Sequence, residues 1–200
     1  MQEPKPLVPH IVDVSQLPDL HPTHLHCEEF WCSLGRAVAT FGFLEEVLKR
    51  AILALTGTYP APPDEADVPA AVEAWRDVVS RSLVGTLSPL IDTFGKSARF
   101  HPDSKHENLD DFLLDLRAAA KLRNIICHGS WGAPDLDGGS VPFYVTGKAG
   151  VEQVFSVPVT VAWLDQLRAH TAELACGVVN TVTHMGYQFP GAAGPGQPVF

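Results

Sequence analysis

The stretch "NLDDFLLDLRAAAKLRNIICHG", residues 108–129, decides the fold because it predicts a long helix with one buried side. Its apolar residues recur at steps of three and four, which is the spacing of one helix face. That face comprises Leu109, Phe112, Leu113, Leu116, Ala119, Ala120 and Cys127. We expect a helix from about Asn108 to His128, closed by Gly129, with this broad side against the rest of the protein.

Four polar residues of the same helix form a second side. At about 100° per residue, Arg117, Lys121, Asn124 and His128 follow one another at steps of four, three and four. Arg123 instead falls in the middle of the apolar side. An unpaired guanidinium is costly to bury, so we expect a carboxylate or a phosphate close to Arg123.

An earlier helix supplies candidate carboxylates. Residues 28–55 repeat apolar side chains with helical spacing and contain the sequence "LEEVLKR". Because this helix is apolar enough to pack against the later one, we expect Arg123 to face Glu45 or Glu46. The same segment offers two favourable intrahelical pairs at a spacing of four residues, Glu45–Lys49 and Glu46–Arg50.

The rest of the chain predicts a helical bundle with one small β element. A second helix begins after Asp67, and Pro89 kinks it or divides it in two. Two β-rich runs flank residues 147–150, which is typical of a hairpin at about 141–157. Helical spacing returns over residues 160–185. We therefore expect a mainly α fold, a four- to five-helix bundle with a β-hairpin inserted before the last long helix.

This organisation divides the chain into three parts. Prolines are frequent near the N-terminus, which indicates an extended arm that we place at residues 1–27. The helical domain covers residues 28–185, and the Gly/Pro-rich residues 186–200 are expected to form a flexible tail. Aromatic residues within helical patterns are expected to pack in the core: Trp31, Phe41, Phe43 and Trp75.

Composition and charge limit the classes of function. The chain has 200 residues, of which 46% are apolar, and a formal net charge of −9. This charge argues against a general duplex-binding protein, although it leaves room for a small basic pocket. No signal-like N-terminus, bilayer-length apolar run or CxxC pair occurs. We therefore expect a cytoplasmic protein with reduced thiols and no membrane partner.

One cluster consists of residue types that bind zinc. His21, His24, His26 and Cys27 lie close together, but their spacing matches no strong zinc pattern. We expect no metal and keep these four residues as weak candidates. No GxxxxGK[ST] or GxGxxG motif occurs, and we expect no cofactor. Four further histidines have no partner that the sequence identifies and are expected in solvent: His101, His106, His170 and His184.

The motif "RNIICH", Arg123 to His128, resembles the signature of the HEPN superfamily of small helical-bundle proteins. That signature is an arginine, often a following polar residue that is commonly asparagine, and a histidine four to six positions after the arginine. The family also often has a glutamate, three residues and then Lys-Arg on an early helix, which "EEVLKR" matches with Glu45, Lys49 and Arg50. The resemblance covers about residues 28–185 and leaves out the arm, the hairpin and the tail.

The resemblance implies a chemistry. Many such proteins are metal-independent endoribonucleases, others only bind nucleotides or RNA, and the active members are dimers whose two arginine–histidine motifs meet. His128 would then be the acid–base group, and Arg123 would offset charge on the pentavalent phosphate. Asn124 would orient His128 or bind an oxygen. RNA carries its own nucleophile, the 2′-OH, so no metal-bound water is needed.

Neighbouring residues complete this hypothesis. Lys121 and Arg117 would contact the phosphate backbone. Ser130 would bind a phosphate or cap the helix, and Trp131 would stack on a base or cover the end of the bundle. The implied partners are RNA or a nucleotide, a second copy of the chain, and an antitoxin or regulatory protein in a toxin–antitoxin or phage-defence pair.

An alternative class stays open. The protein would keep the motif as a remnant and act as a binding or interaction module. Arg123 would then be a structural partner of a glutamate, and His128 would only favour the helix dipole.

Overall fold

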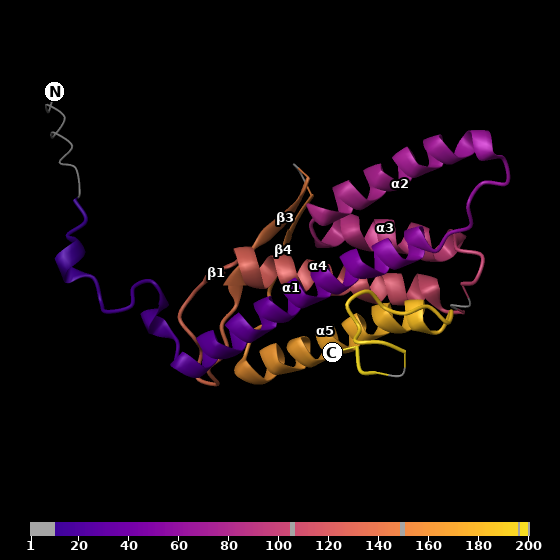
Figure 1. Ribbon diagram of the computed structural model, residues 1–200. Helices are drawn as coiled ribbons and strands as arrows, with labels where there is room; N and C mark the ends of the chain where they lie inside the picture. The colour runs from indigo at the N-terminus through magenta and orange to yellow at the C-terminus, as the bar shows by residue number, and fades with distance from the viewer. Residues whose placement is uncertain (1–10, 105–106, 149–150, 196, 200) are drawn as a thin grey trace, which may run out of the picture.

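The computed structural model describes residues 11–104, 107–148, 151–195 and 197–199. Within these residues the chain forms a bundle of five α-helices (Figure 1). They are α1 (Glu28–Gly57), α2 (Val68–Leu83), α3 (Leu87–Phe100), α4 (Leu109–His128) and α5 (Val161–Thr183). The predicted mainly α bundle is therefore confirmed. The second predicted helix is divided in two, as the proline suggested, and Pro89 lies in the first turn of α3.

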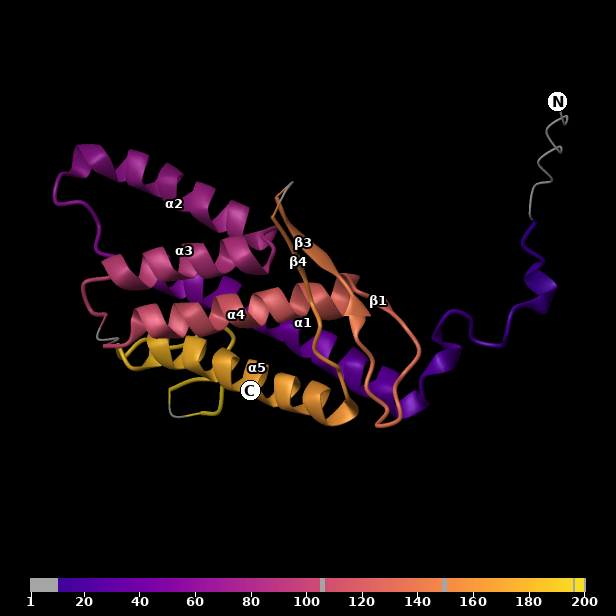
Figure 2. The same ribbon diagram turned by 180° about the vertical axis from the view of Figure 1, so that it is seen from behind.

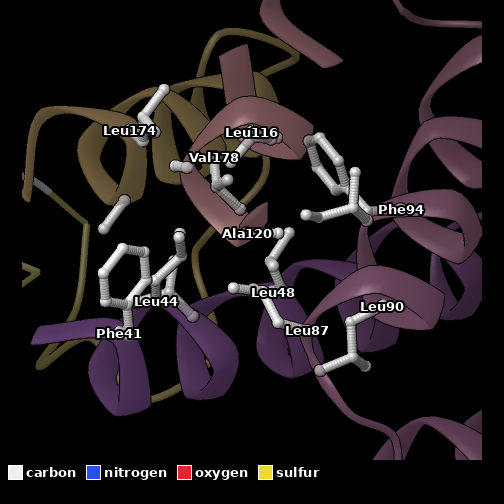
Figure 3. Close-up of a cluster of buried hydrophobic side chains, with 14 of the residues drawn as sticks. Phe41, Leu44, Leu48, Leu87, Leu90, Phe94, Leu116, Ala120, Leu174 and Val178 are labelled. Carbon is white, nitrogen blue, oxygen red and sulfur yellow. The ribbon is translucent and has the colours of Figure 1, made fainter. Parts of the chain in front are cut away.

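α1 is the helix around which the bundle is built, since it contacts each of the other four helices. Its long apolar face packs mainly against α5 and α3, and α4 lies between these two (Figure 3). Burial of a leucine or phenylalanine side chain stabilises a fold by roughly 1.5–3 kcal/mol, so this face supplies much of the stability. Residues at the centre, each at most 5% exposed, are Phe41, Leu44, Leu48, Leu87, Leu90, Phe94, Leu116, Ala120, Leu174 and Val178.

Two glycines allow neighbouring helices to approach α4 closely. A Cβ at Gly95 of α3 would lie 2.7 Å from Leu113 Cδ1, and a Cβ at Gly177 of α5 would lie 2.8 Å from Phe112. Such distances are well inside van der Waals contact, so a larger residue would force the Leu113 or Phe112 side chain, or the helix itself, to shift. The absence of a side chain at these positions therefore leaves room for Leu113 and Phe112 of α4 between α3 and α5.

A small β element connects the end of α4 to the start of α5. β1 (Ser130–Trp131) pairs antiparallel with β2 (Pro142–Phe143), and β3 (Val145–Lys148) pairs antiparallel with β4 (Val151–Val154). The predicted hairpin is thus confirmed, while its turn at 149–150 lies outside the described residues. Pro142 packs against Gly129, where a Cβ would meet the proline ring at 2.7 Å. The sheet consequently begins directly at the C-terminal end of α4.

The two terminal segments differ in their contacts. Residues 11–25 of the arm are exposed and extend away from the bundle (Figure 1). Residues 1–10 are not among the described residues. The tail, which we expect to be flexible, contacts the bundle near its start. Phe189 is 1% exposed within the core, and the Tyr187 hydroxyl donates to Asp103 Oδ2 at 2.5 Å. A single buried phenylalanine in a Gly/Pro-rich stretch gives no periodic signal.

His101, which we expected in solvent, is buried. It follows the last residue of α3 and is 3% exposed. Its Nδ1 accepts a hydrogen bond from the Asp103 N–H at 3.2 Å, so Nε2 carries the proton and donates to Thr58 Oγ1 at 3.1 Å. The prediction was wrong because the Thr58 partner lies 43 residues away in the chain. His170 and His184 are exposed, as expected, and His106 lies outside the described residues.

The aromatic residues expected in the core divide into two groups. Phe41 is 1% exposed and Trp31 is half-buried, as expected, but Phe43 and Trp75 are 39% and 37% exposed. Periodicity identifies the apolar side of a helix and does not show whether another element covers it. Within the described ranges, no helix combines the length and apolar character needed to cross a bilayer.

Candidate functional site

The C-terminal half of α4 is basic on an otherwise acidic chain. From Arg117 to His128 this helix carries three cationic side chains and no carboxylate, whereas its N-terminal half carries Asp110, Asp111 and Asp115. Cations near a helix C-terminus interact favourably with the helix dipole. In Figure 2 this end of α4 leads into β1. The candidate site therefore lies where α4 meets the small sheet.

Arg123 lies at the boundary between the buried side of α4 and its polar side. The side chain is 28% exposed, and Nη2 lies 3.7 Å from Glu45 Oε1 on α1. Nη1 donates to Asn124 Oδ1 at 3.3 Å. Arg123 therefore makes the expected contact with the first helix, and its partner there is Glu45. At 3.7 Å the contact is an ion pair without a hydrogen bond, so Arg123 is neither sealed nor fully paired.

Glu45 is incompletely satisfied by this contact. Its side chain is 20% exposed, yet Oε1 is fully buried and accepts no hydrogen bond from the described residues. A buried polar atom left without a partner costs roughly 1–3 kcal/mol. Within the same residues Arg123 uses one hydrogen bond of a guanidinium that has five N–H donors. The guanidinium therefore retains donors for an incoming anion.

His128 is the last residue of α4 and is exposed. Within the described residues its side chain has no hydrogen bond, ion pair or ring contact. It follows Arg123 by five positions, which places the two side chains about 140° apart around the helix and about 7.5 Å apart along it. Arg123 faces α1, so His128 of the same chain faces solvent on another side.

Asn124 connects the two sides of the helix. It is four residues before His128 and therefore shares its side, while its Oδ1 accepts from Arg123 at 3.3 Å. No hydrogen bond joins Asn124 to His128 in the part of the chain that the structure describes. The observed partner of Asn124 is the guanidinium, which it holds towards the polar side.

Lys121 and Arg117, which we expect to contact phosphates, differ in whether a carboxylate already pairs with them. Lys121 is exposed on the polar side of α4. Arg117 Nη2 donates to Asp92 Oδ1 of α3 at 2.8 Å, with 47% and 59% of the two side chains exposed. Surface ion pairs of this kind contribute about 0–1 kcal/mol, so Arg117 can exchange Asp92 for a phosphate at little cost.

Ser130 and Trp131 form β1, next to His128. Ser130 is exposed, while Trp131 is half-buried against the end of the bundle. Its ring centroid lies 5.2 Å from that of Phe30, at an interplanar angle of 78°, and 6.4 Å from that of His26. Of the two roles expected for Trp131, the one that matches this packing is covering the end of the bundle.

The remaining residues of "EEVLKR" are engaged in structure. Arg50 Nε donates to Glu46 Oε1 at 3.0 Å, which confirms the predicted intrahelical pair. Arg50 also lies against Gly191 of the tail, where a Cβ would meet its Nη1 at 2.7 Å. Lys49 is half-buried on α1, and Glu45 faces Arg123 across to α4. Glu46 and Arg50 thus stabilise the first helix and support the tail.

Cys127 is a site neighbour that sequence reasoning treated only as part of the apolar side. Burial raises the pKa of the Cys127 thiol above its ordinary value of 9.0, the Glu45 charge raises it further, and the Arg123 charge opposes them. The thiol is therefore neutral at physiological pH and unsuited to act as a nucleophile. The signal that could have found it is its position four residues after Arg123.

The weak metal candidates do not assemble. No group of three or more histidine, cysteine, aspartate or glutamate side chains gathers within the residues that the structure describes. His26 instead stacks on Phe30, with ring centroids 4.4 Å apart, and its Nε2 is buried without a partner. Burial lowers the pKa of His26 below its ordinary value of 6.5. This ring belongs to the aromatic cluster beside Trp131.

The chain was compared with protein families, curated proteins and solved structures, and no relative was found. The residues at the end of α4 therefore provide the basis for assigning a function.

Proposed function

We propose that this protein is a HEPN-like, metal-independent RNA endonuclease that acts as a homodimer. His128 is the acid–base residue, Arg123 binds the scissile phosphate, and Asn124 positions the guanidinium. Lys121 and Arg117 hold flanking phosphates. Arg123 and His128 of one chain face different sides of α4, which supports a site completed by a second copy across a two-fold axis.

The chemistry requires no metal. A histidine removes the proton from the ribose 2′-OH, and the oxygen attacks the adjacent phosphorus. Negative charge then accumulates on the non-bridging oxygens, where a guanidinium offers two parallel hydrogen bonds. The bond to the 5′-oxygen breaks as the second histidine donates a proton to it. The products are a 2′,3′-cyclic phosphate and a 5′-hydroxyl, so protons and electrons balance without a further reactant.

The observation that carries this proposal is the unsatisfied Arg123–Glu45 contact. A purely structural pair at this depth would be expected to close its hydrogen bonds, because unmade bonds are costly. Here Glu45 Oε1 is buried without a donor and Arg123 remains 28% exposed. A phosphate arriving at the guanidinium would accept hydrogen bonds from the Arg123 N–H groups that Glu45 and Asn124 leave unused.

A second candidate is supported by the charge. The net charge of −9 repels long RNA over most of the surface. A binding or interaction module, such as the regulatory half of a toxin–antitoxin or phage-defence pair, is compatible with that charge. We also propose that the protein acts in the cytoplasm, where its four free cysteines would stay reduced.

The test is cleavage of a labelled pool of mixed-sequence single-stranded RNA in the presence of a chelator. Wild-type protein is expected to cut, and Arg123→Ala is expected to reduce the rate about 100- to 1,000-fold, as loss of a charge-stabilising donor does. Arg123→Lys keeps the charge but loses the planar fork and should rescue only part of the rate. Arg36→Ala, an exposed arginine on α1, is the matched control. Equal rates for Arg123→Ala and Arg36→Ala would contradict the proposal.

The oligomeric state is measured in parallel by sedimentation. A dimer that persists at the concentrations of the cleavage assay is expected. A monomer that cuts RNA at a rate proportional to its concentration would overturn the two-chain site. A monomer that does not cut would favour the interaction module instead.

A further inference from the structure

A large apolar cavity lies away from α4, between the C-terminal end of α1, the loop that follows it, α2 and the end of α3. Its volume is about 580 Å³, within the range of about 300–1,000 Å³ that is usual for small-molecule sites. The lining is mostly carbon, and its apolar and aromatic side chains include Leu55, Tyr59, Val72, Trp75, Val78 and Phe100. Cavities with such a lining bind apolar molecules and exclude polar ones.

α2 contacts α1 but leaves part of its own apolar side uncovered along this cavity. The apolar side of this helix is left open, since Val72 is 44% exposed and Trp75 is 37% exposed. Ser82, near its C-terminal end, is its one buried residue. α2 lies at the outer edge of the bundle in both views (Figures 1 and 2). An amphipathic helix whose apolar side stays uncovered exposes surface that a ligand would stabilise by burial.

The indole of Trp75 fixes the distance between α2 and α1. Its Nε1 donates to Thr56 Oγ1 at 3.2 Å, and the Thr56 hydroxyl donates to the Ile52 carbonyl at 2.6 Å. Both polar groups are therefore occupied by protein partners. The Trp75 ring remains available as an apolar wall, and its hydrogen bond to Thr56 joins α2 to α1 beside the cavity.

Lys96 of α3 provides the charge at the cavity. It is the one charged residue in the lining, it is exposed, and it makes no ion pair with the described residues. Ser97, half-buried beside it, adds a hydroxyl. A smaller hollow of about 310 Å³ shares Val78 and Lys96 with the cavity and is also lined by Arg81. One cation, Lys96, therefore lines the cavity, and Arg81 lines the adjoining hollow.

We propose that this cavity binds an amphipathic carboxylate, with an apolar chain among the aromatic side chains and a carboxylate at the Lys96 ammonium. Charge complementarity at Lys96 selects an anionic head, and the carbon lining selects an apolar body. A nucleotide fits poorly, because a base and a ribose require several polar partners that this lining does not offer. The proposal is independent of RNA cleavage, since the cavity is formed by α1, α2 and α3.

The probe is decanoate, titrated by calorimetry below its micelle concentration into the wild-type protein. We expect saturable binding of one molecule per chain. Octanoate should bind more weakly, by about fourfold for each methylene removed, because each buried methylene contributes about 0.8 kcal/mol. Amide exchange of α2 should slow when decanoate binds, while that of α5 should not change.

Three variants assign the site. Lys96→Gln should weaken decanoate binding about two- to fivefold, the size expected for an exposed ion pair, and leave the binding of decanol unchanged. Arg168→Gln, an exposed cation of α5, is the matched control and should change neither. Ala71→Trp should fill the cavity and abolish binding of both molecules.

The outcomes separate the alternatives. No saturable binding of decanoate would overturn the proposal, as would unchanged binding by a folded Ala71→Trp protein. If decanoate and decanol bind equally and Lys96→Gln affects neither, the assignment of a carboxylate is wrong. If Ala71→Trp does not fold, the site is still tested by two measurements. One is the titration of Lys96→Gln with decanoate and with decanol, and the other is the amide exchange of α2 with decanoate bound.

Discussion

A histidine lies at the C-terminal end of both α3 and α4, since His101 directly follows α3 and His128 is the last residue of α4, and the two imidazoles are in opposite environments. His101 is 3% exposed, both of its ring nitrogens are hydrogen-bonded, and the rings of Tyr59 and Tyr187 lie 6.1 and 5.6 Å away. His128 is exposed and has no partner within the described residues. His101 therefore packs against the protein at the end of α3, whereas His128 faces solvent at the end of α4.

The difference indicates a structural role for His101 and is compatible with the chemical role that we propose for His128. The buried His101 ring has both nitrogens bonded to the protein and cannot meet a substrate, whereas the exposed His128 ring can. Beside His128 the neighbouring groups are also incompletely satisfied, since Glu45 Oε1 accepts no hydrogen bond from the described residues and Arg123 is 28% exposed. Unmade interactions are expected at sites that bind, and satisfied ones at sites that only support the fold.

The largest expected effect is on cleavage by His128→Ala. Loss of an acid–base residue typically lowers the rate about 100- to 10,000-fold, while an exposed substitution changes the free energy of unfolding by no more than about 0.5 kcal/mol. RNA cleavage and urea denaturation measure the two quantities. His170→Ala, an exposed histidine of α5, is the control. Wild-type cleavage by His128→Ala would remove His128 from the chemistry.

The reverse pattern is expected for His101→Ala. Removing a buried ring and its two hydrogen bonds should lower the free energy of unfolding by about 2–4 kcal/mol. Below its melting temperature the variant should still cut RNA at a rate close to that of the wild type. A loss of stability under about 1 kcal/mol would mean that the end of α3 is less closed than its contacts imply.

A smaller effect is expected for Glu45→Gln. The Arg123–Glu45 pair is long and partly exposed, so the free energy of unfolding should change by less than about 1 kcal/mol. Removal of the competing carboxylate should tighten RNA binding about two- to fivefold at low salt, as measured by filter binding with His128→Ala as background. Destabilisation above about 2 kcal/mol without tighter binding would identify the pair as structural.

The smallest effect concerns Cys127 and pH. Because its pKa is raised in the folded protein, the unfolded thiol ionises first as pH rises above 9.0. Its contribution to stability is therefore complete below pH 9.0 and decreases above it. Iodoacetamide alkylation of a variant that keeps only Cys127 should be slower in the folded than in the unfolded protein at pH 9.0. Equal rates would show that the thiol is not buried.

Periodicity was sufficient to predict the helices that form the core and the position of the hairpin. The predicted limits of the third long helix, about 108–128, agree with α4, because its apolar spacing and Gly129 mark both ends. His101 and Phe189 were not predicted, because their partners lie far away in the chain and neither belongs to a periodic pattern. Trp75 was expected in the core because its pattern is amphipathic, but no helix within the described residues covers that side.

Helical spacing also predicted which site residues lie on one side of α4, but it did not predict their contacts with other residues. One helix contains Arg123, Asn124 and His128, so its spacing reveals which residues share a side. The choice of Glu45 over Glu46 depends on how α1 and α4 pack, and the Asn124–Arg123 hydrogen bond depends on side-chain rotamers. Neither can be read from spacing alone.

The most direct test of the central claim is cleavage, with chelator present, of two oligonucleotides that differ by one oxygen. One is RNA throughout, and the other has 2′-deoxyribose at the scissile position that the first reveals. We predict that the first is cut to a 2′,3′-cyclic phosphate and a 5′-hydroxyl and that the second stays intact. Equal cutting of both, or cutting that stops with chelator, would contradict attack by the 2′-OH under the control of His128 and Arg123.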